Sequence, residues 1–315
     1  MLLFRHCGNF GNLVFIICSS YFLVGKSRPV NKAFRIIIDT ICINWIAIII
    51  FTIFRVDIKV SDIIKSLFPI TFELNWFITC YLIFYAIHPL LNFVLNNLNK
   101  ERLLKLNVFF TILYSIIQFI IPGKFFCSNL VSFIIIFFYT AYLKLYLPNF
   151  SKNRKINTIL LIVSFTLHVL LILITNILGS KFAMFSNQAM RWNNILNPFI
   201  IVFCFSLFNI FSTYSFESKV INYISSLSLS FYVIHENYLF RKYIKPLFYQ
   251  KVFPLGDSRI IWILIEAFSL LVGGLLLAAL YKQTIQKITP KIAEKIYNLF
   301  NKIYKKIETI ILKLN

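Results

Sequence analysis

Apolar residues come in blocks of about 20 along the chain, separated by short polar or basic stretches. A helix needs roughly that many apolar residues to cross the hydrocarbon core of a bilayer. The sequence therefore predicts an all-α fold, a polytopic integral membrane helical bundle of about nine transmembrane helices. We expect these helices at residues 10–24, 35–54, 70–95, 107–122, 129–147, 156–178, 195–213, 224–240 and 259–281.

After residue 283 the pattern changes to that of an amphipathic helix. Thr289-Pro290 suits a helix start, and apolar residues then recur every three or four positions, with lysines on the other faces. We expect a transmembrane domain over 1–283 and a basic amphipathic cytoplasmic tail over 284–315 that lies on the anionic inner leaflet of the bilayer. A solvated helix that packs against a partner is the alternative.

Composition supports a membrane protein. Hydrophobic residues make up 59% of the 315 residues and charged residues 14%, whereas soluble proteins carry roughly 25% charged residues. The formal net charge is +21, but Lys and Arg fall in short loops and in the tail, which is the pattern of membrane topology. We therefore expect contact with lipid headgroups and no nucleic acid partner.

Basic residues also predict the orientation, because cytoplasmic loops are richer in Lys and Arg. One set of alternate loops holds residues 26–35, 100–105, 152–155, Lys219 and the tail; the other holds residues 55–65, Lys124, 181–191 and 241–259. Lysines and arginines are more numerous in the first set, Arg28 among them. We place it in the cytoplasm, so that the N-terminus lies outside and the C-terminus inside.

The six cysteines show no C-x-x-C spacing and lie mostly within apolar blocks. They are typical of small packing residues. We predict no metal site and no bound cofactor.

Residues 235–237 form a His-Glu-Asn triplet inside an otherwise apolar block. Ionisable side chains within a bilayer cost at least a few kcal/mol, so they indicate a functional site by default. At roughly 100° per residue, Ser228, Tyr232 and His235 share one helical face, with Glu236 at its edge. A histidine beside a carboxylate suits proton transfer near neutral pH. The alternative is a hydrogen-bond cluster that holds helices together.

Four other polar residues lie within the apolar blocks. For His88 and His168 we expect structural hydrogen bonds, Glu73 can reach water, and Glu266 requires a partner.

Four stretches resemble the membrane acyltransferase 3 family, in its exopolysaccharide and cell-wall O-acetyltransferase branch. They are "GNLVFIICSSYFLVGK" at 11–26, "LNWFITCYLIFYAIHPLLN" at 74–92, "RWNNILNPFIIVFCFSLFNIF" at 191–211 and "SSLSLSFYVIHENYLFR" at 225–241. No single stretch is strongly specific, but the four in this order are. The resemblance covers nearly all of residues 8–281.

The resemblance implies about ten core spans and transfer of an acetyl group from cytoplasmic acetyl-CoA, the acyl donor, to glycan hydroxyls at the outer face. His235 matches the family's late-helix histidine and, with Glu236, would be catalytic. The neighbouring polar residues would contact substrate, namely Ser228, Ser230, Tyr232, Asn237 and Arg241. Arg35 is placed by charge and topology alone as a contact to the anionic donor.

The chain departs from the family at its start. The family's first helix carries an Arg, ten residues, then a His, whereas here Arg5 is followed at once by His6. Ser20 also stands where the family usually has Gly. We therefore expect a member that lacks the family's first helix, and with it the principal base, and that is truncated or inactive.

The hypothesis is a membrane O-acyltransferase that acts on a surface polysaccharide or cell-wall glycan at the plasma membrane of a bacterium. A polytopic transporter or flippase for a polar or lipid-linked substrate is the alternative, and a membrane scaffold is a third possibility. The acceptor sugar, the acyl group and the oligomeric state do not follow from the sequence.

Overall fold

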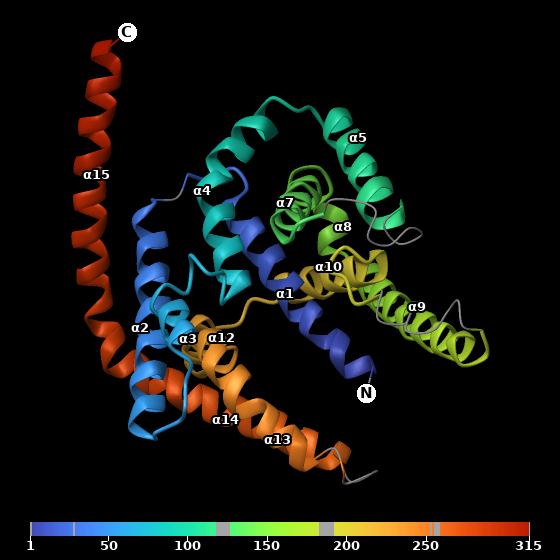
Figure 1. Ribbon diagram of the computed structural model, residues 1–315. Coiled ribbons are helices and arrows are strands. Elements are labelled where there is room, and N and C mark those ends of the chain that lie inside the picture. The colour runs from blue at the N-terminus through green and yellow to red at the C-terminus, as the bar shows by residue number, and fades with distance from the viewer. Residues whose placement is uncertain are drawn as a thin grey trace. The chain divides into compact units, whose positions relative to one another are not determined.

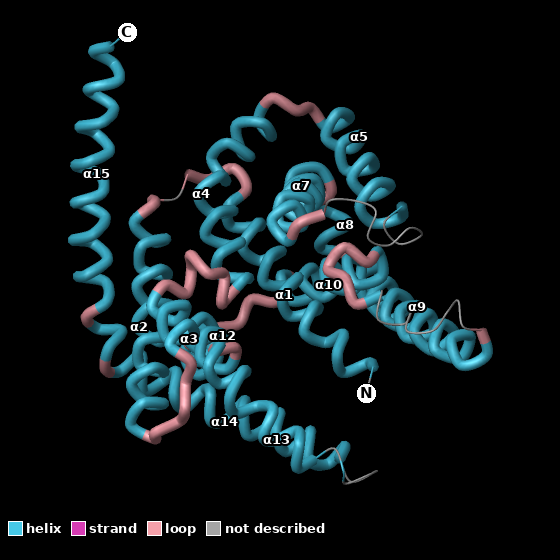
Figure 2. The backbone as a smooth tube through the Cα atoms, viewed as in Figure 1, coloured by secondary structure: helices cyan, strands magenta, loops and turns pink. Residues whose placement is uncertain are grey.

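The computed structural model describes residues 2–27, 29–117, 127–182, 192–252, 254 and 259–314, with side chains from residue 8 to residue 306 except that of residue 259. All regular elements within these ranges are helices (Figure 1), and Figure 2 shows only helix and loop along them. The all-α prediction is confirmed. Several residues used above lie outside the described part, namely Arg28, Lys124 and Arg191, together with the side chains of Arg5 and His6.

The chain divides into two compact units, each built from two separate stretches. The first unit contains Met1–Arg28 and Ile83–Phe216, and the second contains Pro29–Leu82 and Glu217–Asn315. Helix α4 (Trp76–Asn96) begins in the second unit and continues into the first. The expected division at residue 283 stays a prediction.

The first unit is built from the helices α1 (Leu2–Leu23), α5 (Lys100–Phe110), α7 (Asn129–Tyr146), α8 (Pro148–Lys152), α9 (Arg154–Lys181) and α10 (Pro198–Ser212), with a π-helix η1 (Thr111–Ile117). Helix α9 packs on α10, and α1 packs on α7 and α10. Phe84, Phe133 and Phe137 are fully buried and contact one another, so large aromatic side chains form the core of this unit.

Short polar side chains start these helices. Ser128, Asn153 and Asn197 each accept a hydrogen bond from a backbone N–H in the first turn of α7, α9 and α10. These are favoured N-cap residues. Pro198 follows Asn197 at the first helical position, where its missing N–H costs nothing. The polar residues that separate the apolar blocks thus also define where the helices begin.

The second unit is built from the helices α2 (Asn31–Ile53), α3 (Val60–Leu67), α11 (Lys219–Ser226), α12 (Ser228–His235), α13 (Lys245–Val252), α14 (Arg259–Gln283) and α15 (Thr289–Leu314), with a π-helix η4 (Phe240–Ile244) and a short 3₁₀ helix η6 (Ile285–Lys287). Helix α12 contacts both α2 and α14, and α15 runs alongside α2 (Figure 1). Two helices far apart in sequence, α2 and α14, thus share α12 as a neighbour.

Five of the described helices are long and apolar enough to cross a membrane, namely α2, α4, α7, α9 and α14, and shorter apolar helices cover Gly8–Leu23 and Pro198–Ser212. The chain is therefore a multi-pass membrane protein, as predicted. The exact number of nine spans stays a prediction. Residues 107–117 of one expected span lie in α5 and η1, and residues 118–122 lie outside the described part.

The single helix expected over 224–240 is corrected by the structure. This segment forms two short helices, α11 and α12, followed by the non-helical residues Glu236 and Asn237. Asn237 Oδ1 accepts hydrogen bonds from the backbone N–H groups of Leu239 (3.1 Å) and Phe240 (3.4 Å). This local bonding competes with continuation of the helix, so the polar triplet itself ends α12.

The tail forms the expected helix, α15, which uses two apolar faces. Thr289 and Ala293 are buried, and Phe34 of α2 contacts the rings of Tyr297 and Phe300 at 5.6 Å. A second apolar stripe remains 40–61% exposed and is made of Ile288, Ile292, Ile296, Leu299 and Ile303. One face thus packs on α2 in the structure, while the position of the tail on the inner leaflet stays a prediction.

Candidate functional site

His235 is the last residue of α12. Its ring stacks on Phe231, with centroids 4.8 Å apart and 21° between the planes, and meets Tyr232 edge-on at 5.8 Å. Nδ1 of His235 lies 3.1 Å from the carbonyl oxygen of Phe231. This contact assigns the proton to Nδ1, which donates to the carbonyl, and leaves the lone pair on Nε2. A histidine in this tautomer can accept a proton at Nε2.

Glu236 connects His235 to Arg241. Its Oε1 lies 3.5 Å from His235 Nε2, and its Oε2 accepts a hydrogen bond from Arg241 at 2.8 Å. The side chains of His235 and Glu236 are 28% and 31% exposed, so both can be reached from outside the unit. A carboxylate at this distance stabilises the imidazolium that forms when Nε2 takes a proton.

The packing around His235 depends on α14 and on the start of α4. A Cβ at Gly274 of α14 would lie 2.8 Å from the ring of Phe231, the residue on which His235 stacks. Tyr232 contacts the ring of Phe77 at 5.6 Å. Gly274 therefore allows α12 to approach α14 closely, and two aromatic neighbours hold the imidazole in place.

The other predicted contact residues lie in different surroundings. Ser228 is exposed, and its hydroxyl donates to the carbonyl of Ser225 at 2.8 Å. Ser230 is buried. Asn237 is also buried, and its amide donates to Asn44 at 3.2 Å. The structure thus brings Tyr232, Glu236 and Arg241 around His235, but no hydrogen bond among the described side chains joins Ser228, Ser230 or Asn237 to it.

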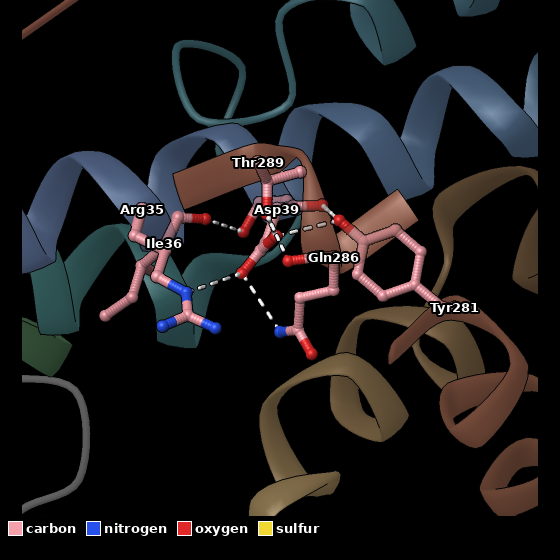
Figure 3. Close-up of polar contacts among 7 residues, drawn as sticks. Arg35, Ile36, Asp39, Tyr281, Gln286 and Thr289 are labelled. Atoms are coloured by element: carbon pink, nitrogen blue, oxygen red, sulfur yellow. Dashed lines mark hydrogen bonds and ion pairs between the residues drawn. The ribbon is translucent and has the colours of Figure 1, made fainter. Parts of the chain in front are cut away.

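A buried carboxylate, Asp39 of α2, organises a second cluster (Figure 3). Its Oδ1 accepts hydrogen bonds from the hydroxyls of Tyr281 (2.8 Å) and Thr289 (2.6 Å), and its Oδ2 accepts one from the amide of Gln286 (3.2 Å). Nε of Arg35 lies 3.9 Å from Oδ2. Side chains of α14, η6 and α15 thus supply the hydrogen bonds that a buried carboxylate requires.

Arg35, the predicted donor contact, therefore lies one helical turn from Asp39 with its side chain 51% exposed. A contact between Arg35 and the acyl donor stays a prediction. Our reading of the sequence missed Asp39, although an acidic residue inside an apolar block is the signal that marks a paired or functional group.

Asp62 of α3, also missed, forms a third cluster with η4 and the residues before it. Its carboxylate lies 2.7 Å from the ammonium of Lys242 and accepts hydrogen bonds from Tyr238 (2.7 Å) and Tyr243 (2.5 Å). Burial raises the pKa of Asp62, but the hydrogen bonds from Lys242, Tyr243 and Tyr238 outweigh it and lower the pKa from 3.8 to about 2. This cluster ties α3 to the segment that follows His235.

Two further histidines are structural. His88 is buried, with Nδ1 2.5 Å from the carbonyl of Tyr85. His168 is buried against Phe10, with Nδ1 3.4 Å from the amide of Asn197. The expected structural contacts of His88 and His168 are thus observed.

A pocket of about 310 Å³ lies in the second unit between α2, α14 and the segment from α12 to η4. Its lining is apolar except for Asn237, Tyr281 and Thr284. Ile234 and Asn237 place one part of the pocket next to His235, and Tyr281 places another next to the Asp39 cluster. The volume falls at the lower end of the range for small-molecule sites, so the pocket offers apolar space beside the candidate base.

Long apolar helices and a histidine–carboxylate pair define a multi-pass helical membrane protein with a candidate acid–base site. The family model described as an acyltransferase domain, Acyl_transf_3, matches residues 5–282, well over half of the chain. The chain therefore belongs to this acyltransferase family, and the resemblance is confirmed at the family level. No curated protein and no solved structure matches the chain.

Family membership confirms the predicted enzyme class, an acyltransferase that transfers groups other than amino-acyl groups. It favours acyl transfer over the transporter alternative. The assignment to the exopolysaccharide and cell-wall branch stays a prediction.

Proposed function

We propose that this membrane acyltransferase transfers an acyl group, acetyl in the first instance, from acyl-CoA to a hydroxyl of a surface polysaccharide or cell-wall glycan. The enzyme would work in the plasma membrane of a bacterium, with the N-terminus outside and the C-terminus in the cytoplasm. The family match supports the reaction class. The four quoted stretches support the donor and acceptor, and the basic loops support the orientation.

The reaction requires a base. His235 Nε2 takes the proton of the acceptor hydroxyl while its oxygen attacks the thioester carbonyl. The C–S bond then breaks, the acyl group stays on the acceptor oxygen as an ester, and the CoA thiolate leaves with the proton from the imidazolium. Glu236 stabilises the imidazolium between these steps, and Tyr232 holds the ring.

One observation supports this role most directly. The Nδ1 contact with the carbonyl of Phe231 leaves Nε2 as the proton acceptor, at 3.5 Å from the Glu236 carboxylate. A buried structural histidine would instead use both nitrogens in the core. The partly exposed edge of His235 leaves Nε2 open to a substrate hydroxyl.

The test is transfer of labelled acetyl from acetyl-CoA to membrane glycan in vesicles from cells that express the full chain. We expect His235→Ala to lower the rate at least about 100-fold, the usual contribution of a general base. His235→Gln keeps a side chain of similar size without a base, and we expect a similar loss. Lys105→Gln, in the first unit, is the control. Wild-type transfer rates in both His235 variants would remove this residue from the mechanism.

A further inference from the structure

Lys144, near the end of α7 in the first unit, caps the end of α1. Its Nζ donates to the backbone carbonyls of Tyr21 (2.7 Å) and Val24 (3.1 Å) and lies 4.6 Å from the centroid of the Tyr21 ring. An ammonium group has three N–H donors. One donor of Lys144 therefore remains after the capping bonds are made.

The turn after α1 places another lysine close by. Gly25 has a φ of 72°, a left-handed conformation that glycine adopts readily. Asn92 of α4 accepts a hydrogen bond from the Gly25 N–H (2.9 Å) and donates to the carbonyls of Leu23 (2.9 Å) and Lys26 (3.2 Å). The turn is thereby fixed, and Lys26 adds a positive charge near Lys144.

A pocket of about 110 Å³ opens beside Lys144. It is lined by a second lysine, Lys152, and by polar side chains that include Ser151 and Asn209. The hydroxyl oxygen of Ser151 is buried and has no hydrogen-bond partner among the described residues. The space exceeds what one water requires, and an unused hydroxyl in its wall calls for a polar occupant.

No carboxylate of the first unit can balance these lysines. Glu101 is the only acidic residue in the sequence of this unit, and it lies 2.8 Å from Lys105. Ammonium groups that are partly buried without a counter-ion are unfavourable. An anion from outside the unit would remove that cost.

We propose that the pocket lined by Lys144, Ser151 and Lys152, the Lys144 pocket, binds a phosphate group. The two ammonium groups and the hydroxyl supply charge-assisted hydrogen bonds to phosphate oxygens. The loops that carry Lys26 and Lys152 are cytoplasmic in the orientation proposed above. This step rests on the proposed function and gives the phosphate a source, the CoA part of the acyl donor. The phosphate of an anionic lipid headgroup has the same chemistry.

The first experiment measures binding of labelled CoA to the purified full chain in phosphatidylcholine nanodiscs. Lys152 is exposed and makes no capping bond, so Lys152→Gln should leave the fold intact. We expect the Kd for CoA to rise about tenfold, the loss of one charge-assisted hydrogen bond, and Ser151→Ala to weaken binding less. Lys152→Arg should bind within threefold of the wild type. Lys155→Gln, on the neighbouring helix outside the pocket, is the matched control and should bind as the wild type does.

A second arm separates the two sources of phosphate. Native mass spectrometry of the protein in phosphatidylglycerol counts retained lipids in the wild type and in Lys152→Gln. Loss of one lipid in the variant, with no CoA binding by the wild type, would keep the phosphate site and contradict the proposed donor. Wild-type binding of both CoA and lipid by Lys152→Gln would overturn the Lys144 pocket, as would a wild type that binds neither. His235→Ala should bind CoA normally while losing transfer, so failure of catalysis and failure of this site are distinguishable.

Discussion

The two units hold their helices together with different chemistry. In the second unit the polar contacts converge on carboxylates, with Asp39 and Asp62 buried and fully hydrogen-bonded. In the first unit they converge on neutral amides. Asn92 fixes the turn after α1, and Asn209 donates to Asn157 between α10 and α9 at 3.0 Å. Contacts of the first kind depend on ionisation, whereas contacts of the second kind do not.

The lysines of the two units show the same difference. Lys242 in the second unit lies 2.7 Å from the carboxylate of Asp62. The partner raises the pKa of Lys242 above its usual value. Lys144 in the first unit bonds only backbone carbonyls among the described contacts. A unit that balances its charges internally has no need of an external ion, and a unit that does not is the better place to look for one.

Removal of Asp39 should have the largest effect on stability. Asp39→Ala leaves Tyr281, Thr289 and Gln286 buried without their acceptor, so we expect the free energy of unfolding to fall by about 3–5 kcal/mol. Thermal unfolding of the purified protein measures this change. Protease cleavage at the junction of α14 and α15 should increase as well, because the contact of α15 with Asp39 is lost.

Asp39→Asn is the matched control for Asp39→Ala. The amide keeps one acceptor oxygen and the shape of the side chain, so the loss should be smaller. Equal stability of wild type and Asp39→Ala would show that the cluster does not hold α15.

The Asp62 cluster should respond to acid. The pKa of Asp62 is about 2 in the folded protein, below its ordinary value of 3.8, so its contribution to stability is present above pH 4. That contribution is lost as the pH falls toward 2. We expect Asp62→Asn to destabilise the protein by roughly 2 kcal/mol at neutral pH. The difference from wild type should shrink below pH 3 in denaturant titrations followed by tryptophan fluorescence.

The contrast with the first unit can be sharpened at Asn92. Asn92→Ala removes three hydrogen bonds to the turn after α1, so we expect a loss of about 1–2 kcal/mol. Because no ionisable group is involved, this loss should be the same at pH 3 and pH 7 in the same titrations. A loss that varied with pH as strongly as that of Asp62→Asn would remove the distinction between the two units.

Much of the fold could be predicted because the bilayer imposes a simple length rule. The blocks at 35–54, 129–147 and 156–178 correspond to α2, α7 and α9 within a few residues. The rule failed at 224–240, where apolar content is high but the side chain of Asn237 bonds the following backbone. Average hydrophobicity does not register one capping residue.

The candidate site was predicted only as far as neighbours in sequence allow. His235 and Glu236 are adjacent, and Tyr232 is one helical turn away, so their proximity follows from helix geometry. The partners of Asp62 and Asp39 come from the far end of the chain. Only a folded structure can show that Lys242 reaches Asp62 or that Thr289 reaches Asp39.

The separation of Asp39 from its partners has a consequence for biosynthesis. Thr289 follows Asp39 by 250 residues, which a ribosome adds in about 12–50 s at common rates. During that time α2 must reside in or near the bilayer with an acidic residue whose hydrogen-bond donors do not yet exist. Arg35, one turn earlier on α2, emerges together with Asp39. The charge that sits half-exposed beside the finished cluster is therefore the first counter-ion that the nascent helix can offer.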